Sequence, residues 1–224
     1  FGFCAVWLRR WLSETPVFQA MHARRELASG LPLRLVFERH LPSVLLSMLV
    51  TWMLTAAILV IILMTPSIVQ SAFHVAPARA FLGNNLASFA LALGCLGYGW
   101  LADRIGYART LLLGAIGLLL CSYALYLDLQ AGAGHFLALY ALTGLAVGVV
   151  GVVPALMVAA FPPAVRFSGL SFSYNIAYAL FGGITPPLIG WLVKQFGVLA
   201  PAHYVAFAAV IGMIVAAGSR GDSR

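Results

Sequence analysis

A stripe of polar side chains at helical spacing is the first feature of this sequence that could do chemistry. Ser171, Tyr174, Asn175 and Tyr178 follow one another at steps of three or four in an otherwise apolar segment, so a helix places them on one face. Their hydroxyl and amide groups suit hydrogen bonding to a small polar solute. The alternative is that they bond only to neighbouring helices or to their own backbone.

Three further segments carry polar side chains of the same kinds. Ser and Thr positions recur at steps of four in the first of them, and amides and hydroxyls occupy adjoining faces of the next. The candidate cavity-lining residues outside the first stripe are Thr51, Thr55, Asn84, Asn85, Ser88 and Tyr140. Because a polar group in lipid is costly, we expect these faces to look inward.

Glycines and prolines interrupt two of the same segments. Gly144 and Gly148 form a small-xxx-small pattern that allows close approach of two helices. Pro154 removes a helical hydrogen bond and is expected to bend its helix. The Gly182-Gly183 pair with Pro186 is expected to break the next one, and broken helices often border a substrate path.

The elements that carry these residues are predicted to be transmembrane helices. The 224-residue chain is 62% hydrophobic and 8% charged, with a mean hydropathy of +1.00, which excludes an ordinary soluble domain. Apolar runs long enough to cross a bilayer predict an all-α membrane fold. The six ranges are 43–69, 80–102, 110–129, 136–161, 169–193 and 202–217.

The net charge of +7 is distributed unevenly between the two sides of the predicted bundle. When alternate inter-helix segments are assigned to one side, 11 of the 13 Lys and Arg residues fall there. The positive-inside rule then puts both chain ends in the cytoplasm of a multi-pass protein of the inner cell membrane. This asymmetry accounts for the charge, so we expect no binding to nucleic acid.

Four parts are expected along the chain. Residues 1–8 are apolar but too short to span and run into Arg9 and Arg10, so they are interpreted as the end of a preceding transmembrane helix. Residues 9–42 are expected to be a cytoplasmic loop between two halves, with a short helix starting at Thr15 and Pro16. Residues 43–218 form the six-helix bundle, and 219–224 a cytoplasmic tail.

Three motifs give the chain a resemblance to a known family. They are RWLSETPVF (10–18), GWLADRIGYAR (99–109) and the segment 161–187 with FPPAVRFSG and FGGITPP. The first resembles the Arg-rich segment after the sixth helix of the metabolite:proton symporters of the major facilitator superfamily. The second resembles the loop between the second and third helices of a half in that superfamily. The third resembles the tenth and eleventh helices.

The resemblance implies a carboxyl-terminal half, helices seven to twelve, built as a 3+3 inverted repeat. It implies proton-coupled symport of a small organic acid or zwitterion by alternating access, with the missing amino-terminal half as partner. By the same resemblance, Asp103, Arg104, Arg109 and Arg166 have a gating role at the cytoplasmic side. Gly99 permits close packing and Gly106 a tight turn.

No cofactor or metal is expected. His74, His135 and His203 fall near the predicted outer loops, but they lack local ligand spacing. We expect no proton-carrying side chain inside the six spans, so the titrating group is placed in the missing half. Two other functions stay open: a half-size membrane protein that self-dimerises or does not transport, and an integral-membrane enzyme, for which no catalytic motif is found.

Overall fold

The regular structure of the chain consists of helices throughout the described part. The computed structural model describes residues 32–218. The elements, in chain order, are α3 (Pro32–Arg39), α4 (Leu41–Ala56), η1 (Ala57–Met64), α5 (Thr65–Phe73), α6 (Pro77–Ile105), α7 (Tyr107–Ala131), α8 (Phe136–Val147), η2 (Gly148–Val152), α9 (Val153–Ala159), α10 (Arg166–Ala177), η3 (Tyr178–Gly182), α11 (Gly183–Phe196) and α12 (Ala200–Gly218).

These elements make six helices that are long and apolar enough to cross a membrane, which confirms the predicted fold class. Three of the six are composite. The first runs through α4, η1 and α5 for 33 residues, the fourth through α8, η2 and α9 for 24, and the fifth through α10, η3 and α11 for 31. The other three are α6, α7 and α12.

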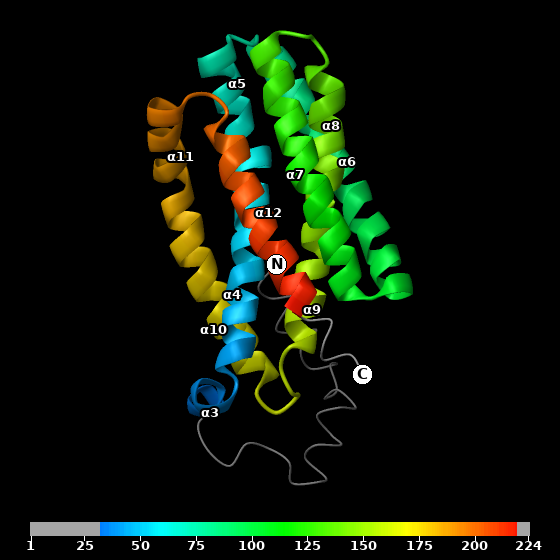
Figure 1. Cartoon of the computed structure of the whole chain (residues 1–224), viewed down its shortest axis with the longest axis vertical. Helices are drawn as coiled ribbons and strands as arrows, with labels where there is room; N and C mark the ends of the chain where they lie inside the picture. Colours follow the sequence, from blue (N-terminus) through cyan, green and yellow to red (C-terminus); the bar gives the residue numbers. More distant parts are fainter. Residues whose placement is uncertain (1–31, 219–224) are drawn as a thin grey trace, which may run out of the picture.

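Figure 1 shows the six helices running roughly side by side, with α10 and α11 on one flank and α6, α7 and α8 on the other. We call the end that contains residues 73–79, 129–136 and 196–200 the upper end, and the opposite end, next to α3, the lower end. α3 lies at the end of the segment that the sequence predicts as a cytoplasmic loop, and its Arg34 and Glu38 pair at 2.7 Å. The helix expected from Thr15 and the segments 1–8 and 219–224 lie outside the described residues.

A close helix contact joins α6 to α8 and the start of η2 through small residues. A Cβ at Gly144 would meet the backbone of Ala87, and a Cβ at Gly148 would meet the backbone of Gly94 and Cys95. The relation is mutual, because a Cβ at Gly94 would meet the carbonyl oxygen of Leu145. Without side chains between them the two backbones touch, and van der Waals contact of this kind is what holds helices together in lipid.

A buried hydrogen-bond chain joins α4, α11 and α12. The indole Nε1 of Trp52 donates to Tyr204 Oη at 2.9 Å, and Tyr204 Oη lies 2.7 Å from Thr185 Oγ1. Trp52 also stacks on Phe181, with ring centroids 4.4 Å apart and planes at 3°. These contacts fix the flank of α10 and α11 against the centre of the bundle.

Each composite helix departs from α-helical winding just before a proline. η1 and η3 are π-helical and η2 is a 3-10 helix, and they end at Met64, Gly182 and Val152, respectively. Pro66, Pro186 and Pro154 follow within two to four residues. A proline lacks the N–H that its i−4 carbonyl needs, and its ring crowds that carbonyl, so the preceding turn widens or tightens.

Candidate solute-facing site

An exposed strip on the first composite helix is the starting point of the site. Leu59, Leu63, Ser67 and Ser71 recur at steps of four along η1 and α5 and range from half-buried to exposed. On one side, the position of a Cβ at Gly182 in η3 lies 3.5 Å from Tyr178 and 3.9 Å from Leu59. The strip therefore borders η3 directly.

The other side of the strip forms a groove with the first turns of α6. The groove has a volume of about 520 Å³, and its lining residues are Leu63, Pro66, Ser67, Gln70, Ser71 and Phe81. Asn85 is exposed one helical turn after Phe81. The term open face is used below for one surface with three parts. They are this groove, the strip on η1 and α5 (Leu59, Leu63, Ser67 and Ser71) and the polar stripe on α10 and η3 (Ser171, Tyr174, Asn175 and Tyr178). Sequence reasoning missed the groove, although Ser67 and Ser71 continue the four-residue spacing of the predicted hydroxyls.

The predicted stripe on α10 and η3 lies beside the strip. Tyr174 and Tyr178 are half-buried, with ring centroids 5.3 Å apart. Asn175 is exposed, and its Nδ2 donates to the Ser171 carbonyl at 2.7 Å, which leaves its Oδ1 as an acceptor. The structure thus brings the four stripe residues together at one edge of the open face.

A second group of predicted residues forms a buried hydrogen-bond centre between three helices. Tyr140 of α8 is fully buried, and its Oη lies 2.7 Å from the carbonyl oxygen of Ile61 and 2.8 Å from the side-chain oxygen of Asn84. A hydroxyl has one hydrogen, so it donates to only one of these oxygens. Turning the Asn84 amide by 180° lets its NH₂ donate to Oη while Oη donates to Ile61. Tyr140 thereby joins α6 and α8 to the π-helical segment.

The same π-helical segment is held from α7. Thr65 Oγ1 donates to the Val60 carbonyl at 2.8 Å, an i to i+5 contact. It also lies 2.9 Å from Tyr126 Oη, which is fully buried. The carbonyls of Val60 and Ile61 in η1 therefore each have a side-chain partner, as buried backbone groups require.

Two predicted cavity residues lie in the core. Thr51 and Thr55 are fully buried, and their hydroxyls donate to the carbonyls of Ser47 and Thr51, respectively, at 2.7 Å. This is the backbone bonding that Ser and Thr make within helices. We therefore do not place either threonine at the open face. Ser88 is half-buried on α6, one turn from Asn84 and Asn85.

The predicted helix-breaking glycines differ in their surroundings. Gly106 has a φ of 89° between α6 and α7, a conformation that suits glycine. A Cβ at Gly99 or Gly183 would meet no atom within 4 Å. The close packing expected at Gly99 is therefore absent within the described chain, because that face of α6 meets no other described element.

The predicted gating residues gather at the lower end. Asp103, Arg104 and Arg109 are exposed around the α6–α7 turn, and the Arg104 guanidinium lies 4.2 Å from the centroid of the Trp100 ring. Arg166 Nε donates to the Phe161 carbonyl at 3.1 Å. Two ion pairs are found between residues 32 and 218, Arg34–Glu38 and Asp128–His135. Neither of them involves any of these four residues.

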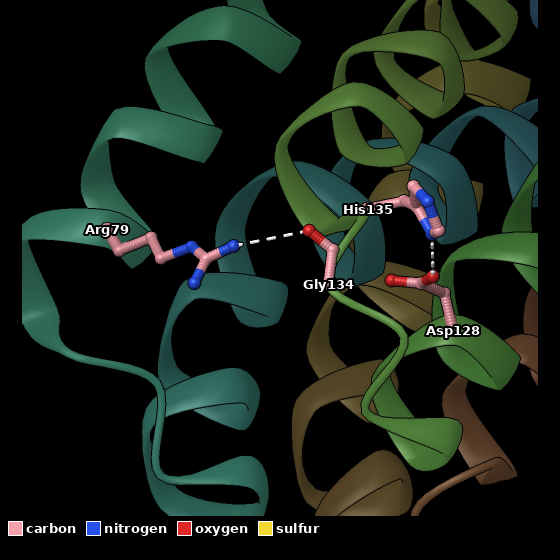
Figure 2. Close-up of polar contacts among 4 residues, drawn as sticks. All are labelled: Arg79, Asp128, Gly134 and His135. Carbon is pink, nitrogen blue, oxygen red and sulfur yellow. Dashed lines mark hydrogen bonds and ion pairs between the residues drawn. The ribbon is translucent and has the colours of Figure 1, made fainter.

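The expectation that the spans lack ionisable side chains is wrong at two positions. Asp128 lies in the last full turn of α7 and His203 in the first turn of α12. Both residues lie inside the predicted ranges 110–129 and 202–217, near the ends of their helices, and the expectation overlooked them. Asp128 Oδ1 lies 3.0 Å from His135 Nδ1, and Figure 2 shows the two side chains paired. The centroid of the His203 ring lies 5.5 Å from that of Tyr123.

Comparison with known proteins adds relatives along nearly the whole chain. The chain is 25% identical over 227 residues to a Staphylococcus aureus protein named for proline and betaine transport, matching 96% of this chain and 47% of that protein. It is 28% identical over 224 residues to the inner membrane metabolite transport protein YhjE of Escherichia coli, matching 93% and 49%. No family model matches the chain.

A third relative is the glycine betaine/proline/ectoine/pipecolic acid transporter OusA of Dickeya dadantii, 24% identical over 228 residues, with 95% of this chain and 44% of that protein matched. The chain spans about half the length of the curated relatives it matches. Fold and relatives together define a polytopic helical membrane protein whose relatives are named as transporters.

Proposed function

We propose that this chain forms half of a secondary transporter that moves a small zwitterionic metabolite or organic acid by alternating access, coupled to protons. A second set of helices faces the open face and completes the solute path. In this arrangement the six spans act as helices seven to twelve, related as a 3+3 inverted repeat.

The chemistry of the open face carries the proposal. The described residues that line it offer hydroxyls, amides and aromatic rings, and none of them is charged. A zwitterion has no net charge but needs acceptors for its ammonium group and donors for its carboxylate, and hydroxyls and amides supply both. Aromatic faces also attract quaternary ammonium groups. The named substrates of two of the relatives, betaine and proline, have this character.

The charges at the two ends support a proposal for the orientation. Arg34, Arg39, Arg104, Arg109 and Arg166 lie at the lower end. We place this end in the cytoplasm of the inner membrane under the positive-inside rule. Asp103 and the arginines of the α6–α7 turn then lie at the cytoplasmic side, where they contact the other half when that side is closed.

Solute exchange by purified full-length protein in vesicles tests the proposal. Vesicles preloaded with proline or glycine betaine should take up the same labelled solute above the level of empty vesicles, without any ion gradient. Asn175→Ala should lower the apparent affinity about ten- to a hundredfold, since a hydrogen bond to a charged group contributes about 1.5–3 kcal/mol. Ile176→Ala, the exposed neighbour on another side of the helix, should exchange normally.

Two results would count against the proposal. Folded protein that exchanges no solute from a panel of organic acids and zwitterions would exclude it. Transport by a symmetric dimer of the 224-residue chain would favour a self-dimerising half-size protein instead.

A further inference from the structure

The upper end of the bundle holds a buried carboxylate next to an exposed imidazole. Asp128 is 7% exposed in its side chain, and its Oδ1 lies 3.0 Å from His135 Nδ1. The other oxygen, Oδ2, is buried without a hydrogen-bond partner among residues 32–218. The His135 side chain is 72% exposed. Figure 2 shows the two side chains pointing toward each other across the turn between α7 and α8.

The helix ends make each member of this pair depend on the other. Asp128 lies in the last full turn of α7, where the carbonyl groups give a negative partial charge, and His135 is the N-cap of α8, where the N–H groups give a positive one. A carboxylate and an imidazolium are therefore both disfavoured by their own helix. The Asp128 carboxylate is buried, and only its Oδ1 has a hydrogen-bond partner among the described residues. That partner is the His135 ring, which offsets part of the cost of burying the charge.

Other titratable groups at this end surround the pair without joining it. On α6, Arg79 donates from Nη2 to the Gly134 carbonyl at 3.3 Å, which ties the α7–α8 turn to α6. His203 of α12 contacts Tyr123 of α7, and His74 ends α5 with a φ of 53°. The nearby phenols are those of Tyr123 and Tyr126 on α7 itself and Tyr204 on α12, and α8 contributes Tyr140 further down.

The protonation chemistry follows from the ring's orientation. With Nδ1 directed at Oδ1, the neutral ring carries its hydrogen on Nδ1, and the lone pair of Nε2 is free on an exposed ring. A hydronium ion from the solution then gives its proton to Nε2 and leaves as water. The product is an imidazolium bonded to a carboxylate, and direct attraction between the two opposite charges is added to the hydrogen bond.

We propose that Asp128 and His135 form a proton-binding site that is open to the solution at the upper end. A proton bound at this site stabilises the turn between α7 and α8. His135 immediately precedes α8, the helix that carries Tyr140. The turn between α7 and α8 therefore affects the position of α8, whose Tyr140 hydrogen-bonds to η1. Only the effect on solute movement rests on the proposed function.

Melting of the full-length protein in nanodiscs tests the site without any transport measurement. The melting temperature of the wild type should be about 2–4 °C higher at pH 5.5 than at pH 7.5, because protonation turns the bond between His135 and Asp128 into an ion pair. His135→Gln and Asp128→Asn should lose this difference. His135→Arg carries a permanent charge and should melt alike at both pH values. His203→Gln, at the same end but beside Tyr123, should keep the wild-type difference.

The results that overturn the site are distinct from those that overturn transport. If His135→Gln keeps the full pH difference, or if His203→Gln abolishes it, the pair does not bind the proton. In vesicles, the wild-type exchange rate should depend on the pH of the solution at the upper end, and His135→Arg should flatten that dependence. Absence of any exchange would remove the proposed function, while the melting data would still decide the site.

Discussion

Replacing Gly94 with alanine should lower the melting temperature of the protein by several degrees, whereas the same change at Gly97 should leave it unchanged or slightly higher. The two glycines lie three residues apart on α6. A Cβ at Gly94 would meet the Leu145 carbonyl oxygen and lie 3.1 Å from Gly148 Cα, while at Gly97 it meets nothing within 4 Å. These neighbours of Gly94 are backbone atoms, so α6 and α8 must separate, at a cost of about 1–3 kcal/mol.

The pair of variants isolates packing from helix propensity. Alanine favours a helix over glycine by about 0.5–1 kcal/mol, and this gain applies at both positions. The comparison should be made on detergent-purified protein with equal recovery by size-exclusion chromatography. Equal melting temperatures for the two variants would show that α6 and α8 are not in backbone contact.

The second large effect is expected for Tyr140→Phe. The change removes the hydroxyl that contacts the Ile61 carbonyl and Asn84 and leaves a buried acceptor unsatisfied, which costs about 1–3 kcal/mol. We expect a lower melting temperature and slower solute exchange, because the π-helical segment next to the open face loses its partner. Tyr123→Phe is the control, since no hydrogen bond of that hydroxyl is found within 32–218.

A double-mutant cycle with Asn84→Ala shows whether the contact acts as one unit. Once Tyr140 has lost its hydroxyl, the further loss of the Asn84 amide should cost clearly less than it does in the wild type. Strictly additive effects of the two changes on melting temperature would argue against the shared hydrogen-bond centre.

The six helices were predictable from the sequence because hydropathy reports the solvent directly. The predicted range 110–129 lies inside the observed helix Tyr107–Ala131. The composition of the ends is less informative, since a helix continues beyond the apolar stretch as long as its hydrogen bonds are met. Asp128 and His203 lie within the predicted ranges 110–129 and 202–217, so their helical conformation was predicted. The pair formed by Asp128 and His135 was missed, because the sequence does not show how the turn between α7 and α8 brings the two side chains together.

Departures from α-helical winding were partly predictable. Pro154 and Pro186 mark η2 and η3, and both were expected to disturb their helices. Pro66 marks η1 in the same way, but the apolar run around it hides the signal. Proline position therefore predicts where a helix deviates, while the choice between a wider and a tighter turn depends on tertiary contacts such as those of Tyr140 and Thr65.

Polar spacing alone did not separate core from cavity. Thr51 and Ser67 share a four-residue period, yet Thr51 is fully buried and Ser67 borders the groove. A hydroxyl that bonds to its own helix backbone is compatible with either environment, so the neighbouring helices decide. Asn175 is different because its amide nitrogen is used by Ser171 and its oxygen remains available at an exposed position.

Accumulation of solute against its gradient is the most direct test of the central claim that this chain belongs to a proton-coupled transporter. Vesicles that contain the full-length protein, acidic outside and alkaline inside, should concentrate labelled proline or glycine betaine above the external level. A protonophore should return the solute to equilibrium. Uptake that never exceeds the external concentration would contradict proton coupling, and uptake no greater than that of protein-free vesicles, by protein shown to be folded, would contradict transport itself.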